Sequence, residues 1–149
     1  MIVAFTGHRP DKLVGRIDAV NQCVAEFLDR VKPDKVISGM ARGVDTIAAL
    51  KAREKKIPYV AAVPFMSQVT NHSDEDCATW VSLIQDAVDV KIVCEGGYAV
   101  WKFQKRNEWM VDNCDLLVAV WDGSRGGTAN CIDYAKKVGR PIEYLNWRS

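Results

Sequence analysis

The chain has 149 residues, a length that suits one domain with its own hydrophobic core. Hydrophobic residues make up 48% of it and charged residues 26%, values that argue against intrinsic disorder. The formal net charge of +1 provides no general attraction to nucleic acid or to an anionic membrane, although it leaves room for local basic patches.

The sequence also indicates a cytoplasmic protein that contacts no membrane. Its longest apolar stretches, such as residues 59–65, are far too short to span a bilayer. Residues 1–7 have no basic leader before their apolar run, so they are typical of a strand entering a turn and not of a signal peptide. The five cysteines are scattered without a Cys-x-x-Cys pair, which predicts small buried thiols in a reducing compartment and no metal site.

Short runs of β-type residues alternate with longer segments of helical period along the chain. Strands are predicted at residues 2–6, 35–38, 58–63, 90–94, 116–121 and 142–145. Helices are predicted at residues 13–31, 43–55, 77–87, 100–113 and 126–138. This alternation predicts an α/β fold, a Rossmann-like three-layer sandwich with a mostly parallel sheet of about six strands, in one domain over residues 1–149.

The turn after the first predicted strand carries candidate ligand-binding residues. Ligands of open parallel sheets bind outside the carboxyl ends of the strands, where such turns gather. Gly7 permits close approach of the backbone, Arg9 offers a planar donor fork for phosphate, and His8 can donate a hydrogen bond or transfer a proton. The alternative is an ordinary turn with a surface arginine and a histidine that caps or packs.

The turn after the second strand is rich in small residues and opens a helix. Free amides at a helix amino terminus form an anion site, and Ser38 adds a hydroxyl donor. Asp45 either caps this helix or contacts the ribose of a ligand. The candidate binding residues of the turn are Ser38, Gly39, Met40, Ala41, Gly43 and Asp45.

The turn after the most apolar strand again places glycines and a hydroxyl at the start of a helix. Gly126, Gly127 and Thr128 form this third candidate phosphate site. None of the turns matches the G-x-G-x-x-G or G-x-x-x-x-G-K-[ST] pattern, which argues against standard dinucleotide and P-loop chemistry. Together the turns predict a small-molecule nucleotide ligand at one edge of the sheet, with no cofactor required.

Residues 38–45, SGMARGVD, resemble the SG-x-A-x-G-x-D signature of the SLOG superfamily, which includes the DNA-processing protein DprA and the LOG phosphoribohydrolases. The best overall match is the YpsA-like family, to which the chain is similar at residues 6–9, 64–65, 103–107, 115–117 and 127–128. The resemblance covers nearly the whole chain. It implies a nucleotide or nucleotide-derived ligand, held by Gly39 and Gly43 on one side and by Gly127 and Thr128 on the other.

The resemblance to the LOG enzymes also implies a departure from their chemistry. Arg106 matches an arginine of those enzymes, but Cys131 occupies the position of the glutamate that acts on their N-glycosidic bond. A thiol cannot stabilise an oxocarbenium-like centre as a carboxylate does. Asp122 and Glu95 are the candidate catalytic carboxylates that could substitute, although Asp122 equally suits a turn cap before Gly123. Cys131 could act as a nucleophile only with a lowered pKa.

Three functions follow from these residues, in order of preference. The first is a module that binds or senses a nucleotide-derived ligand, and the second is an N-glycosidase of nucleoside monophosphates. The third is a DprA-like nucleic-acid-binding module, which the near-neutral charge disfavours. Trp101 or Phe65 suits base stacking, while the other tryptophans suit the core or the subunit interface of a homo-oligomer.

Overall fold

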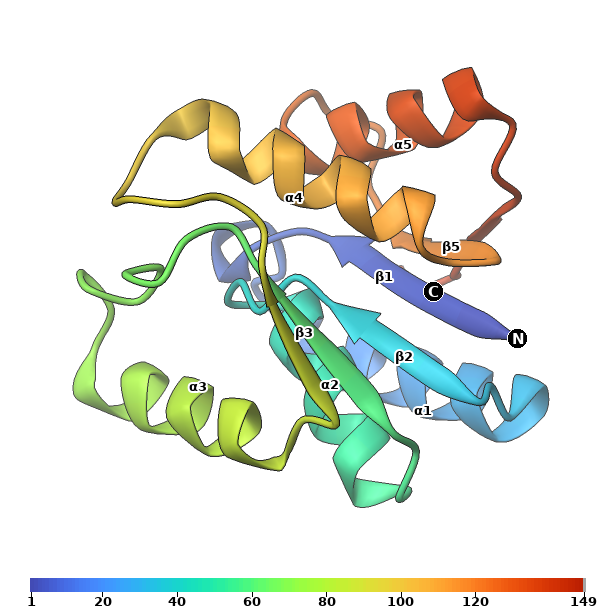
Figure 1. Ribbon diagram of the computed structural model, residues 1–149. Coiled ribbons are helices and arrows are strands. Elements are labelled where there is room, and N and C mark those ends of the chain that lie inside the picture. Colours follow the sequence, from blue (N-terminus) through green and yellow to red (C-terminus); the bar gives the residue numbers. More distant parts are fainter. Residues whose placement is uncertain (149) are drawn as a thin grey trace.

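The computed structural model describes residues 1–148 and consists of alternating strands and helices (Figure 1). The strands are β1 (Ile2–Gly7), β2 (Lys35–Ser38), β3 (Tyr59–Val63), β4 (Asp89–Ile92), β5 (Leu116–Val120) and β6 (Ile142–Tyr144). The α-helices are α1 (Ile17–Val31), α2 (Val44–Glu54), α3 (Asp74–Asp86), α4 (Val100–Asp112) and α5 (Gly127–Val138), and a short 3-10 helix, η1, covers Pro10–Lys12.

The strands form one six-stranded sheet in the order β4-β3-β2-β1-β5-β6, and every neighbouring pair is parallel. This confirms the predicted Rossmann-like α/β fold. From β1 the chain runs outward through β2, β3 and β4 on one side, and it returns to add β5 and β6 on the other. The direction of winding therefore changes between β1 and β5, where the register pairs Gly7 with Val120 at the carboxyl ends.

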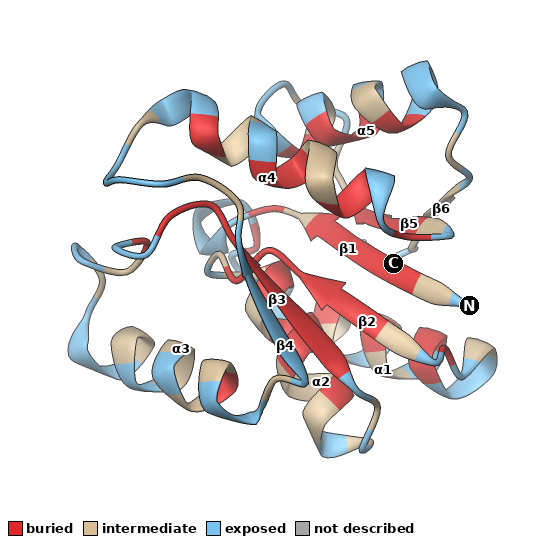
Figure 2. Cartoon of the chain, in the orientation of Figure 1, coloured by how far each residue is buried: buried red, intermediate tan, exposed pale blue. Residues whose placement is uncertain are grey.

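Helices cover both faces of the sheet, as three layers require. Helices α1, α2 and α3 lie on one face and α4 and α5 on the other (Figure 1). The central strands are buried on both sides, as Figure 2 shows, because each face of β1, β2, β3 and β5 meets helices or neighbouring loops. The apolar runs of these strands supply most of the stabilising burial.

Some predicted boundaries are wrong for local reasons. Helix α1 begins at Ile17 and not at residue 13, because η1 and a left-handed Gly15 (φ 74°) precede it. Leu13 is nevertheless fully buried, so its place in the hydrophobic pattern comes from the core and not from the helix. Helix α3 begins before residue 77, at Asp74, since the Ser73 side chain caps it.

Strand β4 also differs from its prediction. It covers Asp89–Ile92 instead of residues 90–94, and all of its residues are exposed. It lies at one edge of the sheet and pairs only with β3. No helix within residues 1–148 has the length and apolar character needed to cross a bilayer.

The cap of α3 provides a test of the local structure. The Ser73 hydroxyl accepts a hydrogen bond from the Asp76 amide at 3.1 Å. Loss of such a cap costs about 1 kcal/mol. We expect Ser73→Ala to lower the free energy of unfolding by that amount in urea denaturation. Ser67→Ala is the control, because within residues 1–148 the Ser67 hydroxyl makes no hydrogen bond, and equal stability of the two variants would contradict the cap.

Candidate functional site

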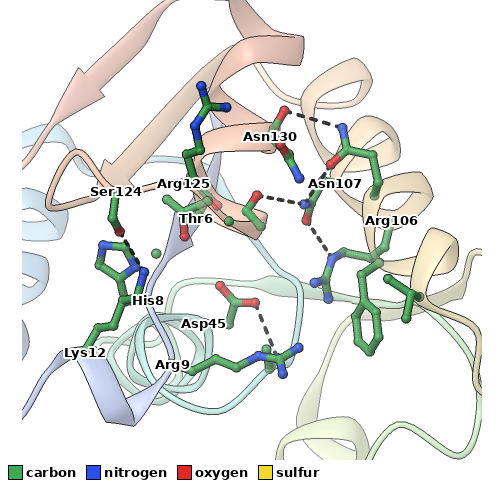
Figure 3. Close-up of a pocket in the computed structure, with 18 of the residues that line it drawn as sticks. Thr6, His8, Arg9, Lys12, Asp45, Arg106, Asn107, Ser124, Arg125 and Asn130 are labelled. Atoms are coloured by element: carbon green, nitrogen blue, oxygen red, sulfur yellow. Dashed lines mark hydrogen bonds between the residues drawn. The ribbon is translucent and has the colours of Figure 1, made fainter.

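A hollow of about 570 Å³ opens at the carboxyl ends of β1 and β5 (Figure 3). It therefore lies where the winding of the sheet reverses, the position at which open α/β sheets bind their ligands. Its walls come from four segments: the β1–η1 loop, the start of α2, the first half of α4 with the loop before it, and the β5–α5 turn. We call this hollow the main cavity.

The structure brings parts of all three predicted turns to the main cavity. The predicted binding residues in its lining are Gly7, His8, Arg9, Ala41, Asp45, Arg106, Gly126, Gly127 and Thr128. Outside the lining are the predicted binding residues Ser38, Gly39, Met40 and Gly43 and the predicted catalytic residues Glu95 and Asp122. The second turn thus contributes less surface to the cavity than its glycine-rich sequence suggests.

The β5–α5 turn presents unoccupied backbone donors to the main cavity. Helix α5 has no side-chain cap at Gly126, whose φ of 142° suits glycine. Within residues 1–148, no oxygen accepts a hydrogen bond from the amides of Gly127, Thr128 or Ala129. Gly127 lines the cavity, and a Cβ built on it would meet nothing within 4 Å, so no side chain covers the turn at this residue. Open amides at the positive end of a helix dipole suit an anion.

The start of α2 differs, because the chain itself uses its donors. The Val44 amide donates to the His8 carbonyl at 3.1 Å, and the Thr46 amide donates to the Ala41 carbonyl at 3.2 Å. The Asp45 carboxylate accepts from the Ala41 amide at 3.3 Å. Sequence reasoning predicted free amides here, and the structure shows them largely satisfied.

The SGMARGVD segment closes on itself and on its neighbours. The Ser38 hydroxyl donates to the Asp45 carbonyl at 2.7 Å and accepts from the Met40 amide at 3.1 Å. Gly43 has a φ of 90°, and a Cβ there would collide with the His8 carbonyl. A Cβ on Gly39 would lie 2.6 Å from an Arg106 guanidinium nitrogen. The two glycines of SGMARGVD, Gly39 and Gly43, therefore allow the second turn to pack closely against Arg106 and against the residue that follows β1.

Arg106 is a buried cation in the wall of the main cavity, with 5% of its surface exposed. Its Nη1 donates to the Gly39 carbonyl and its Nε donates to the Asn107 side-chain oxygen at 3.0 Å. Burial lowers the pKa of Arg106, and the nearby Asp45 carboxylate opposes that shift. Burial likewise raises the pKa of Asp45, against the charge of Arg106. The two groups therefore compensate each other's charge in a poorly solvated place.

A chain of side-chain amides ties α4 to the open turn of α5 (Figure 3). Asn107 accepts from Arg106 and donates to the Gly127 carbonyl and to the Gln104 oxygen, both at 3.4 Å. Gln104 in turn donates to the Asn130 carbonyl at 3.4 Å. Sequence reasoning assigned no role to Gln104 or Asn130. Gln104 and Asn130 lie two residues from Arg106 and Thr128, and this spacing places side chains on different faces of a helix, so it gave no signal for either residue.

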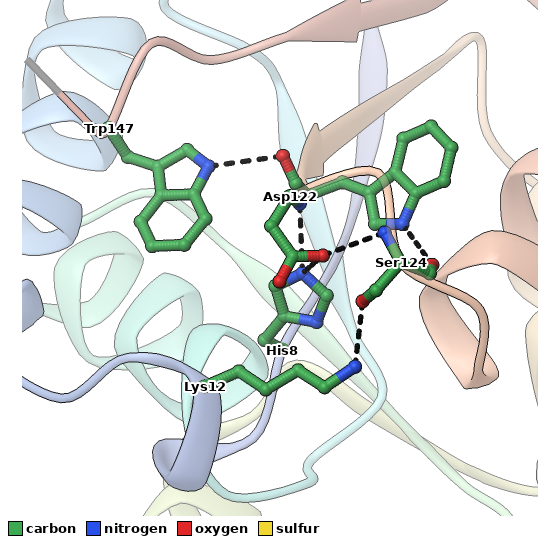
Figure 4. A network of polar contacts seen from close by, with 6 residues as sticks. His8, Lys12, Asp122, Ser124 and Trp147 are labelled. Carbon is green, nitrogen blue, oxygen red and sulfur yellow. Dashed lines mark hydrogen bonds and ion pairs between the residues drawn. The ribbon is translucent and has the colours of Figure 1, made fainter.

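The two carboxylates predicted as catalytic lie away from the cavity lining. Asp122 accepts from the Ser124 amide at 2.8 Å, which is the turn-capping alternative, and the Ser124 contacts lower its pKa to about 2 (Figure 4). A group with such a pKa is ionised at neutral pH and holds no proton to donate. The exposed Glu95 contributes its backbone carbonyl to Lys102 Nζ at 2.6 Å.

His8 and Cys131 are both buried. The His8 Nε2 accepts from the Asp122 amide at 3.0 Å and lies 3.1 Å from an Asp122 carboxylate oxygen. Burial lowers the pKa of His8 against the effect of the Asp122 charge, so the neutral imidazole is favoured. Burial also raises the pKa of the Cys131 thiol to about 12. A thiol with this pKa is not a nucleophile at neutral pH. Within residues 1–148, no group of three or more His, Cys, Asp or Glu side chains is arranged to hold a metal ion.

Cations outnumber carboxylates around the main cavity. Its basic side chains are Arg9, Lys12, Arg106 and Arg125, and its carboxylates are Asp11 and Asp45. This balance favours an anionic ligand although the whole chain is almost neutral.

The mouth of the main cavity is aromatic. Trp101 and Tyr98 line it with 60% and 70% of their surfaces exposed. Arg9 lies over the ring of Phe103 at 5.3 Å and separates the main cavity from a second hollow of about 350 Å³. Phe65, the other predicted stacking residue, is buried beneath Tyr98 and Phe103 and lines that second hollow. Trp101 is therefore the better placed of the two for stacking on a ligand in the main cavity.

These features define a Rossmann-like domain of the SLOG superfamily, with a ligand-sized cavity at the switch point of its sheet. The chain belongs to the DNA recombination-mediator protein A family, whose model matches residues 3–148. The narrower YpsA-like assignment stays a prediction.

Known relatives extend this family assignment. The chain is 32% identical over 137 residues to the uncharacterized SPbeta prophage-derived protein YoqJ of Bacillus subtilis (strain 168), with 80% of each chain covered. Among solved structures, it is similar to DNA processing protein A of Helicobacter pylori, described for its single-stranded DNA binding mode (TM-score 0.69, 18% identity, 97% of this chain and 64% of the other).

A second solved structure is the molybdenum cofactor carrier protein of Chlamydomonas reinhardtii (TM-score 0.61, 17% identity, 96% of this chain and 74% of the other). At such identities the structural likeness shows the shared fold alone. The chain spans about half of the DNA processing protein A of Streptococcus pneumoniae, 49% of that chain.

The contact between Gly39 and Arg106 can be tested by adding one methyl group. In Gly39→Ala the new Cβ would lie 2.6 Å from Arg106 and 2.7 Å from the Asp45 carboxylate. Overpacking of this kind costs about 1–3 kcal/mol, so urea denaturation should show a loss of that size. Gly127→Ala is the matched control, because its Cβ meets open space. Equal losses in both variants would refute the packing role of Gly39.

Proposed function

We propose that this domain binds a nucleotide or nucleotide-derived phosphate ligand in the main cavity and acts as a binding or sensing module. The observation that carries the proposal is the open first turn of α5, which faces the same cavity as Arg106. Backbone amides at a helix start and a guanidinium are both donors that suit phosphate oxygens.

The exposed arginines complete the phosphate environment. Arg9 and Arg125 line the main cavity from opposite walls, the β1–η1 loop and the β5–α5 turn (Figure 3). Within residues 1–148 neither forms an ion pair, so their charges are uncompensated in the free protein. Lys12 is less available, because its Nζ donates to the Ser124 hydroxyl at 2.7 Å.

The cavity also suits the organic part of a nucleotide. Its volume of about 570 Å³ falls in the range typical of small-molecule sites, about 300–1,000 Å³. The exposed rings of Trp101 and Tyr98 at the mouth provide flat surfaces for a base. An inorganic anion alone would leave this aromatic surface uncovered.

Binding without catalysis is the better supported form of the proposal. Cys131 stands where a glycosidase of the LOG type has its glutamate, and its thiol is buried with a raised pKa. Asp122 and Glu95 lie outside the lining. Glycosidic cleavage would have to use Asp45, the one buried carboxylate that lines the cavity within residues 1–148.

A second candidate is the binding of single-stranded nucleic acid. It is supported by membership of the DNA recombination-mediator protein A family and by the exposed cations and aromatic rings at the cavity mouth. Such platforms bind successive bases by stacking. The near-neutral charge of the chain weighs against a long electrostatic footprint.

The proposal is tested by calorimetry with inorganic phosphate and a panel of nucleotides. Arg9→Ala and Arg125→Ala should each weaken nucleotide binding about tenfold, since one charged hydrogen bond contributes about 1.5 kcal/mol. Lys137→Ala removes the same charge near the opposite end of α5 and should leave the affinity unchanged. Absence of binding at millimolar ligand would refute the proposal. Tight binding of an oligonucleotide at low salt, with no mononucleotide binding, would favour the second candidate.

A further inference from the structure

Asp45 presents an unused carboxylate oxygen to the main cavity. Its Oδ2 accepts from the Ala41 amide at 3.3 Å, while no donor within residues 1–148 contacts its Oδ1. Within residues 1–148, the polar side-chain atom that is both fully buried and without a hydrogen-bond partner is His72 Nδ1. Asp45 Oδ1 also has no partner but does not share this full burial, so part of its surface is accessible. Asp45 points toward the middle of the cavity in Figure 3. The oxygen is therefore available to a ligand.

The surroundings of Asp45 place its carboxyl group near positive charge and fix its position. Burial raises the pKa of Asp45, and the positive charges of Arg106 and Arg9 and the hydrogen bond from the Ala41 amide oppose that shift. The Ser38 hydroxyl holds the Asp45 carbonyl at 2.7 Å, so the first turn of α2 cannot easily shift. The result is a fixed acceptor inside a cavity in which cations outnumber carboxylates.

A carboxyl group offers an acceptor oxygen in either protonation state. When it is ionised it repels a phosphate group, so its partner on an anionic ligand is a neutral donor elsewhere on that ligand. In a nucleotide, the neutral donors nearest to the phosphate ester are the sugar hydroxyls. A vicinal diol offers two such donors to one carboxylate, the role that an acidic residue plays toward ribose in other Rossmann-type sheets.

We propose that Asp45 reads the ribose hydroxyls of the ligand, so that the site selects ribonucleotides over 2′-deoxynucleotides. This inference rests on the proposed function, because it needs the phosphate to occupy the α5 turn. The phosphate and sugar positions then lie on different walls, with the phosphate at Gly127 and Thr128 and the sugar at the start of α2. Selection at Asp45 would also disfavour DNA, which lacks the 2′-hydroxyl.

The test compares sugars on the unmodified protein first. Calorimetry is run with the four ribonucleoside 5′-monophosphates, their 2′-deoxy and 2′,3′-dideoxy forms, and inorganic phosphate. We expect the preferred ribonucleotide to bind at least tenfold more tightly than its 2′-deoxy and 2′,3′-dideoxy forms, because loss of the 2′-hydroxyl leaves a buried acceptor without its donor. This comparison needs no substitution and does not depend on how a variant folds.

Two variants then assign the selectivity to a residue. Asp45→Asn keeps the shape of the side chain and should reduce the ribose preference to less than threefold while retaining phosphate binding. Asp11→Asn is the matched control, because Asp11 also lines the cavity but is exposed on η1, and it should keep the full preference. Circular dichroism confirms that both variants are folded.

The outcomes separate the inference from the function on which it rests. Equal affinity for the ribose and 2′-deoxyribose forms would overturn the inference and leave nucleotide binding standing. A full ribose preference in folded Asp45→Asn protein would also overturn it, since another residue would then read the sugar. Failure of every nucleotide and of inorganic phosphate to bind would instead refute the proposed function.

Discussion

The buried guanidinium of Arg106 is the contact on which the arrangement of the cavity depends. It extends from α4 to the Gly39 carbonyl after β2 and also donates to Asn107, which bonds to the turn of α5. Helices on one face of the sheet are thereby joined to a turn that leads to the other face. A buried charge is costly unless it is paired and hydrogen-bonded, so Asp45, Gly39 and Asn107 must all stay close to it.

Two helix amino termini meet near this cation, and they serve different purposes. The amides before and at the start of α2 donate to oxygens of His8, Ala41 and Asp45, and these hydrogen bonds hold this wall of the main cavity in place. The turn before α5 leaves its donors open. The more distinctive sequence motif, SGMARGVD, is therefore mainly architectural, whereas the plainer Gly-Gly-Thr turn has the free amides that an anion needs.

The sequence predicted the fold well because each element has a strong local pattern. The apolar runs identify the strands, and the helical period identifies α1, α4 and α5. The parallel direction of the strands follows from the alternation of strands and helices. The start of α1 was missed because Leu13 continues the apolar pattern while lying outside the helix. Leu13 is buried because it packs into the core, and its position happens to match the helical period of α1. A single sequence cannot separate these two causes of an apolar residue.

The candidate site was only partly predictable, for a physical reason. Strand-end turns can be recognised locally, and those after β1 and β5 do meet at the switch point. The contribution of α4 depends on which helices share a face, so Gln104 and the links made by Asn107 could not be deduced from spacing alone. Likewise, the pattern around Asp122 fits both a catalytic carboxylate and a turn cap, and the structure shows the capping contact with the Ser124 amide.

The closeness of two buried charges, Arg106 and Asp45, bears on why the cavity would keep them. No direct hydrogen bond or salt bridge joins these two groups within residues 1–148, and buried opposite charges are often no more stabilising than apolar residues of similar size, so stability alone is a poor reason for them. In the cavity wall the two groups present opposite requirements to a ligand, an anion for the arginines and a neutral donor for the carboxylate. A simple anion satisfies only the first requirement. A ligand that carries a phosphate and hydroxyls on one rigid frame satisfies both requirements. The two buried charges then favour such a ligand over a simple anion, although burying them is unfavourable for folding.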